Sequence, residues 1–258
     1  AIEAVNAPLK ITISALVRFL ENPGRMFTNH HLGLYLHDYA LDLDDDEPFD
    51  SSKLVEYKLR QQMLDAVLSN DPKACELVRQ EYQLNGQLPD SHVGARSIDT
   101  SQDEAQALVD ELHGVNYDQI QKHRVCVNVL GIIIEDEVAL TGEPSLQNSS
   151  LKVVLSRPTK AKPKDRLTLW LTTLVSQVAF DQAVTGVSVH LEKNLHIEGL
   201  DDAQAQLNSI ISLYLIGLTK ALPLDAELGL ELLKVGPEDQ EKRRSAWQKK
   251  WYPYVKFM

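Results

Sequence analysis

Residues 138–158, VALTGEPSLQNSSLKVVLSRP, are two apolar segments joined by a polar turn, the shape of the strand hairpin that carries metal ligands in many magnesium-dependent nucleases. Such a site needs carboxylates that converge on Mg²⁺ and a lysine that steadies the attacking water. Counted from Gly142 in the nuclease pattern G-x-h-D, the aspartate position holds Ser145, and the second segment offers Ser156 but no carboxylate. Glu143 is the nearest acid. The positions Glu143, Ser145 and Ser156 therefore predict a degenerate site, with no catalytic residue, no bound metal and no cofactor.

Other common catalytic patterns are missing from the sequence. It has no H-E-x-x-H zinc motif, no G-x-x-x-x-G-K-[ST] phosphate loop, no G-x-G-x-x-G motif and no G-x-S-x-G elbow. Cys75 and Cys126 are too far apart for a zinc finger, and we expect two buried, reduced thiols. Residues 42–47, DLDDDE, begin like a calcium loop, but Glu47 stands where that loop requires glycine, which favours a solvated acidic loop.

Basic residues follow the hairpin closely. A loop with two prolines leads here toward a predicted helix, and its cations are either solvated or track DNA phosphates. They are the candidate DNA contacts of the chain: Arg157, Lys160, Lys162, Lys164 and Arg166. The net charge of −11 argues against DNA binding over most of the surface. A DNA contact is therefore predicted to be local or shared with a partner, and composition alone favours a protein-binding module.

A second basic stretch lies near the end of the chain, where lysines and arginines alternate with tryptophans and tyrosines over residues 242–254. Aromatic residues among cations can stack on bases. We favour instead a helix that buries Trp247 and Trp251 while its lysines face water.

The order of the predicted elements defines the fold class. Residues 1–118 are mainly helical, whereas from about His123 the apolar spacing changes from 3.6 to 2 and residues 119–258 form a sheet with packed helices. The pattern predicts helices at about 14–22, 51–68, 72–84, 101–112, 163–183, 201–220 and 237–251, and strands at about 124–129, 137–141, 151–155 and 187–191. No Gly/Ser-rich or Pro-rich linker divides the chain, so we expect a single α/β (mixed α+β) domain over residues 1–258.

The apolar runs are far too short to span a bilayer, and no signal peptide is visible. These features predict a cytoplasmic protein without a membrane partner. The abrupt start at Ala1 is typical of a fragment whose N-terminus lies upstream.

Two stretches of the sequence carry a family resemblance. Residues 14–27, SALVRFLENPGRMF, and residues 47–64, EPFDSSKLVEYKLRQQML, resemble two signatures of the C-terminal domain of RecC, the gamma subunit of bacterial exodeoxyribonuclease V. A weaker match is GQLP at residues 86–89, and the resemblance covers roughly residues 12–180. It implies a PD-(D/E)xK nuclease-like core with a helical N-terminal part and a degenerate catalytic site.

The same resemblance implies a role in recombinational double-strand-break repair. The domain would support DNA strand separation and docking of sister subunits without catalysis of its own. The implied partners are a RecB-like beta subunit, a RecD-like alpha subunit and a double-stranded DNA end or fork inside the complex.

Two alternatives remain open. One is a protein-interaction domain that never touches DNA. The other is an active Mg²⁺-dependent nuclease that uses Glu143, together with Glu135, Asp136 and Glu137.

Overall fold

The computed structural model describes residues 9–32, 53–86, 88–89, 92–145, 150–222, 226–235 and 237–255. Their helices are α1 (Ile13–Glu21), α2 (Pro23–Leu32), α3 (Lys53–Leu68), α4 (Pro72–Leu84), α5 (His92–Gly114), the 3-10 turn η1 (Tyr117–Gln119), α6 (Pro163–Phe180), α7 (Ala203–Thr219), α8 (Ala226–Val235) and α9 (Gln240–Val255). Their strands are β1 (Leu9–Ile11), β2 (Gln121–Val129), β3 (Ile132–Thr141), β4 (Leu151–Arg157), β5 (Val184–His190) and β6 (Leu195–Ile197).

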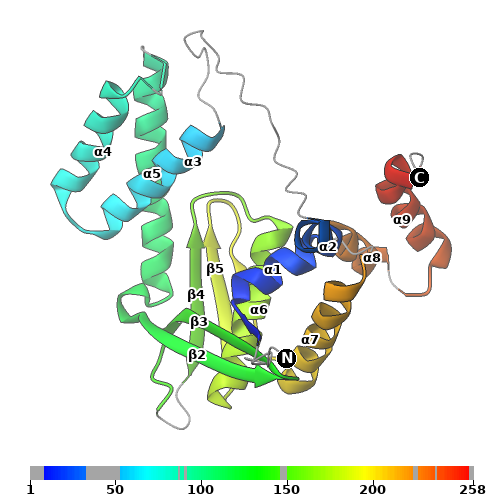
Figure 1. Cartoon of the computed structure of the whole chain (residues 1–258). Coiled ribbons are helices and arrows are strands. Elements are labelled where there is room, and N and C mark those ends of the chain that lie inside the picture. The colour runs from blue at the N-terminus through cyan, green and yellow to red at the C-terminus, as the bar shows by residue number, and fades with distance from the viewer. Residues whose placement is uncertain are drawn as a thin grey trace, which may run out of the picture.

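In the described residues the strands form one mixed sheet in the order β1-β3-β4-β5-β6, with β2 paired to β3 (Figure 1). β2 and β3 pair antiparallel from Gln121↔Leu140 to Val129↔Ile132. Leu130 and Gly131 connect them, and both have positive φ angles, 51° and 83°. This is the pattern of the two-residue hairpin turn whose twist matches that of the strands. β4, α6 and β5 then form a parallel crossover, with Leu151↔Val184 in register.

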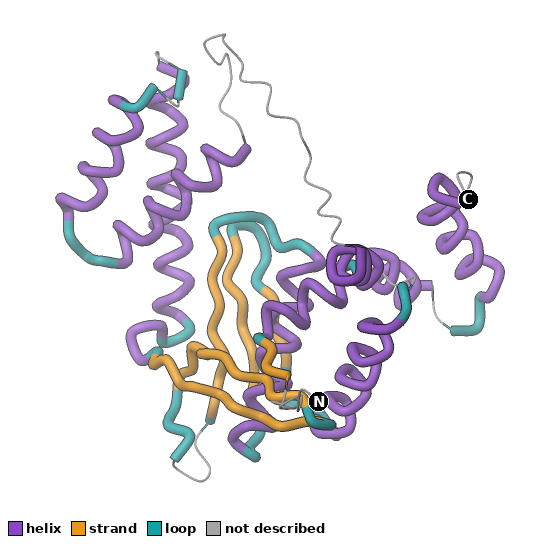
Figure 2. The backbone as a smooth tube through the Cα atoms, in the orientation of Figure 1, coloured by secondary structure: helices purple, strands orange, loops and turns teal. Residues whose placement is uncertain are grey.

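Strand β4 is buried on both faces, as the uniform apolar run at 151–155 predicts. Val153 belongs to a core that α1, α6 and α7 share with strands β1–β5, whereas its neighbour Val154 joins a second core built by α3, α4 and α5. Successive side chains of a strand point to opposite faces, so β4 ties the two cores together. Figure 2 shows the three helices α3–α5 grouped beside the sheet, with α7 on the other side of it.

Local signals explain several helix starts. Thr12 begins α1, since its side chain accepts a hydrogen bond from the Ala15 amide, and Asp71 with Pro72 begins α4 in the same way through the Lys73 amide. The first predicted helix and the one expected at about 72–84 are thus confirmed. So are the meander and the mixed α/β fold class.

Other expectations were wrong. The helix predicted at 101–112 begins nine residues earlier, at His92. Gly94 lies in its first turn, where a Cβ atom would overlap the Pro89 carbonyl oxygen, so the close approach of this backbone requires glycine. The short strands β1 and β6 and helix α8 were not predicted. Cys126 is exposed on β2 rather than buried, and Trp247 on α9 is 41% exposed. The acidic loop at 42–47 and the EPF residues lie outside the described part of the chain.

Within the described residues, no helix is both long and apolar enough to cross a bilayer.

Candidate functional site

Glu143 and Ser145 lie together just after β3. Gly142 ends that strand with a φ of 91°, and an added Cβ atom would lie 2.8 Å from the Ser150 carbonyl oxygen, so glycine is needed here. The Ser145 hydroxyl donates to Glu143 Oε1 at 2.6 Å. This hydrogen bond, with a second one from the Ser145 backbone, lowers the pKa of Glu143. Glu143 is therefore an ionised carboxylate satisfied by its own turn.

Ser156 lies far from this pair. Thr141 pairs with Lys152 at the start of β4, and Ser156 comes four residues later, about 13 Å further along an extended strand. There it pairs with Val189 of β5 and is exposed. The structure thus brings Glu143 and Ser145 together and places Ser156 at the opposite end of the hairpin.

The acidic residues of the alternative nuclease site also separate. Glu135 pairs with Lys10 at 3.1 Å and with Arg124. Asp136 Oδ2 accepts a hydrogen bond from the Ile13 amide at 2.9 Å, the first residue of α1. In the described residues, no three His, Cys, Asp or Glu side chains gather in a group that could hold a metal ion.

Asp136 and Glu137 line a cavity of about 740 Å³ between β3, β4, α1 and α6. The cavity lies beside residues 136–139 of β3 and near the end of β4. The side chain that β4 contributes to this cavity is Leu155 rather than Ser156, since neighbouring strand residues face opposite ways. Lys164 reaches the same cavity and pairs with Glu21 at 2.8 Å. The β4 side chain in this wall is therefore apolar.

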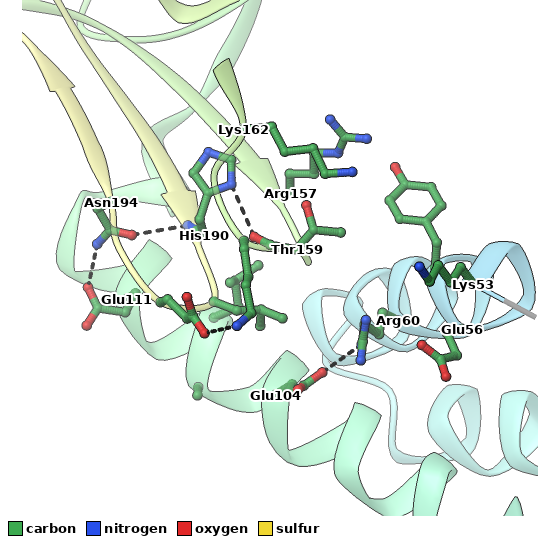
Figure 3. A pocket seen from close by; sticks show the side chains of 16 residues that line it. Lys53, Glu56, Arg60, Glu104, Glu111, Arg157, Thr159, Lys162, His190 and Asn194 are labelled. Carbon is green, nitrogen blue, oxygen red and sulfur yellow. Dashed lines mark hydrogen bonds and ion pairs between the residues drawn. The ribbon is translucent and has the colours of Figure 1, made fainter. Parts of the chain in front are cut away.

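The basic loop is divided between two places. Arg157, Lys160 and Lys162 line a second cavity of about 920 Å³, which lies between the ends of β4 and β5 and the helices α3 and α5 (Figure 3). Lys164 lies at the first cavity, and Arg166 is exposed outside both. Three of the five candidate DNA contacts therefore share one site.

Arg157 is the fixed centre of this site. Its Nη1 donates to Asp165 Oδ1 at 2.6 Å, while Asp165 Oδ2 accepts from the Lys162 amide at 2.8 Å and so caps α6. The guanidinium also lies over the Tyr57 ring, 5.5 Å from its centroid. Burial lowers the pKa of Arg157, but Asp165 and Tyr57 raise it by more, and the net direction is upward. The cation is therefore permanent and held in one position.

His190 closes the back of the site and is buried. Its Nδ1 lies 3.3 Å from the Thr159 carbonyl oxygen, so this nitrogen carries the proton, and Nε2 accepts from the Ser188 hydroxyl at 2.9 Å. Burial lowers the pKa of His190 against the opposing effect of Asp165. The Thr159 hydroxyl is also buried, yet it has no hydrogen-bond partner among the residues that the structure describes.

Comparison with protein families matches residues 8–236 to the family described as the RecC C-terminal domain. The chain belongs to this family. The match extends beyond the residues 12–180 that carry the sequence resemblance, into the last third of the chain. A solved structure described as the crystal structure of SSO0001 is 13% identical, with 83% of this chain and 79% of that chain covered and a TM-score of 0.34, too low to support any inference. A search of curated proteins found no match.

As a RecC C-terminal domain, the chain has a mixed α+β, nuclease-like fold. RecC is a subunit of the RecBCD complex, exodeoxyribonuclease V, a multi-subunit machine of DNA repair whose catalytic activities reside in other subunits.

Sequence reasoning missed Asp165, Tyr57, Thr159 and His190 in this RecC site. Asp165 had a signal, because Pro163 at the first helical position and an acid two residues later are typical of a helix start. Tyr57 belongs to the second family signature, but nothing in that signature places it beside Arg157, a hundred residues later. His190 had no signal, since it lies in an ordinary strand pattern.

Proposed function

We propose that this chain is a non-catalytic structural domain of the exodeoxyribonuclease V gamma subunit, acting in recombinational double-strand-break repair in the cytoplasm. It supports separation of the DNA strands and docks the RecB-like beta and RecD-like alpha subunits. Residues 1–258 act in it as a single nuclease-like unit with a mainly helical first part, residues 1–118.

The observation that carries this proposal is the combination of RecC family membership with a nuclease hairpin that lacks a carboxylate pair. Glu143 is bound by Ser145, and Leu155 is the β4 residue that faces Asp136 and Glu137 across the first cavity. A two-metal nuclease needs several oxygen ligands around each ion. We therefore assign the nuclease-like fold a scaffolding role.

The proposed DNA contact is local, as the charge of −11 requires. Arg157, Lys160 and Lys162 form its inner part, and Arg166 extends it outward. Lys160 and Lys164 add weaker contributions, because Glu192 and Glu21 already balance their charges. Each phosphate contact that is lost reduces the slope of log affinity against log salt by about 0.7–0.9.

The test uses RecC reconstituted with its beta and alpha partners. Lys160, Lys162 and Lys164 are changed to glutamine together, and complex assembly is followed by size-exclusion chromatography beside unwinding of a forked duplex. We expect assembly to be kept and unwinding to become slower and less sensitive to salt. Unwinding equal to that of the wild type, with an unchanged salt dependence, would refute the DNA contact.

A second candidate is an interaction domain without DNA contact. The helices α3–α5 expose large apolar side chains to solvent: Leu54, Leu77, Leu84 and Val93. Such residues at the surface fit a partner protein. Under this alternative, polar substitutions of Leu77 and Leu84 would abolish assembly, whereas the triple lysine variant would unwind DNA normally.

A further inference from the structure

We infer that the cavity of about 920 Å³ at the ends of β4 and β5 binds one nucleotide of a single DNA strand, with its phosphodiester at the loop 158–162 and its base toward α5. This inference deepens the proposed function, since it names the part of the DNA that the site takes. Ligands of parallel αβ units bind outside the carboxyl ends of the strands, and β4 and β5 are such a parallel pair.

The loop side of the cavity is suited to a phosphate. Arg157 is held by Asp165. Lys162 is the N-cap residue of the 18-residue helix α6. Lys162 and Lys53 form no ion pair within the described residues, so their charges remain for a ligand. The Thr159 hydroxyl is buried in the same wall and has no partner in the described part of the chain, although buried hydroxyls are normally hydrogen-bonded. A phosphate oxygen would supply that missing partner.

The opposite side of the cavity is lined by carboxylates. Glu104 pairs with Arg60 at 2.8 Å and Glu192 with Lys160 at 2.5 Å, whereas among the described residues Glu111 accepts only from a neutral donor, Asn194 Nδ2, at 3.0 Å (Figure 3). Glu111 therefore has free acceptor positions. The exocyclic amino group of cytosine donates to carboxylates, whereas thymine has no amino group.

A recessed position favours a single strand over a duplex. Phosphates of a duplex lie on a convex, stiff rod and meet the rim of a cavity, while a flexible strand can turn one nucleotide inward. Tyr57 beside Arg157 adds an aromatic surface of the kind that single-strand sites use.

The experiment measures binding of fluorescent (dC)8 and (dT)8, whose length of about eight nucleotides suits a single-strand site, by anisotropy with the purified protein. The variants are Lys162→Gln and Thr159→Val, and Lys220→Gln is the control, since it removes the same charge from an exposed lysine at the end of α7, outside the cavity. We expect (dC)8 to bind more tightly than (dT)8, and Lys162→Gln to weaken binding about tenfold, as a lost charge-assisted hydrogen bond does. Thr159→Val should weaken binding while the melting temperature stays equal or rises, an outcome that a purely structural role for the hydroxyl would not give.

Backbone amide shifts of residues 159–162 and 164 on addition of the dinucleotide d(CpC) report cavity occupancy directly. Shifts at these amides, together with losses specific to Lys162→Gln and Thr159→Val, support the inference. Equal effects of Lys162→Gln and Lys220→Gln, or d(CpC) shifts confined to other loops, overturn it and leave the proposed function standing. A third outcome separates the two proposals. If these amides shift, but the complex that contains the triple lysine variant unwinds DNA at the wild-type rate, the site is supported and the proposed role in strand separation is refuted.

Discussion

Replacing Asp165 with asparagine removes the charge that holds Arg157 while keeping the shape of the side chain. Asp165 is 7% exposed and accepts two hydrogen bonds, from Arg157 Nη1 and from the Lys162 amide. A hydrogen bond between charged groups contributes about 1.5–3 kcal/mol to stability, and a helix cap about 1 kcal/mol. The asparagine oxygen retains one of the two bonds, so we expect a loss of about 2–3 kcal/mol in the free energy of unfolding.

Urea titration at neutral pH, followed by circular dichroism, measures that loss. Asp118→Asn is the matched control, because the Asp118 side chain is 74% exposed and its one ion pair, with His113, lies at the surface; we expect less than about 0.5 kcal/mol there. A double-mutant cycle with Arg157→Met should give a coupling energy of about 1 kcal/mol or more. Equal small losses for Asp165→Asn and Asp118→Asn, or additive effects in the cycle, would show that the Arg157–Asp165 pair does not organise the loop.

Three further predictions concern the sheet, the hairpin and the buried histidine. Gly186→Ala should destabilise the protein by about 1–3 kcal/mol in thermal unfolding, because the new Cβ atom would overlap Thr173 Oγ1 and lie 3.0 Å from Leu169 Cδ1, whereas Gly229→Ala, with nothing within 4 Å, should not. Glu143→Ala should leave oligonucleotide cleavage in Mg²⁺ or Mn²⁺ at the level of the wild-type protein; any cleavage that it abolishes would support the nuclease alternative. Because burial lowers the pKa of His190 below its ordinary value of about 6.5, its contribution to stability is complete above that value and is lost as the pH falls below it, so unfolding free energies should drop between pH 7 and 5 less steeply in His190→Gln than in the wild type.

Much of the fold follows from local patterns in the sequence. The alternation from 124 to 129, the caps at Thr12 and Asp71 and the long apolar strand at 151–155 each predict the element that is observed. The elements that were missed are those whose stability comes from distant contacts. β1 has three residues and exists because Leu9–Ile11 pair with Ile132–Ile134, about 120 residues later.

The candidate site was predictable only in part, for the same reason. The basic residues of the loop are visible in the sequence, but their division between two cavities depends on where α6 begins and on how the helices α3 and α5 pack. Arg157 meets Tyr57 across a hundred residues of sequence. A periodic pattern shows which face of each element is apolar, and it does not show which polar side chains of two elements meet.

In the proposed non-catalytic role, the hairpin stabilises the fold without holding a metal ion. Carboxylates that converge without a metal repel each other and raise each other's pKa values, which destabilises the sheet that holds them. Here Leu155 faces the first cavity from β4, and Asp136 is bound to the first amide of α1, where a negative charge is favourable. Asp136 thus orients α1, and Leu155 adds apolar contact to the core. α6, which packs against the same sheet, is the helix whose start positions Asp165, Arg157 and the loop beside the second cavity.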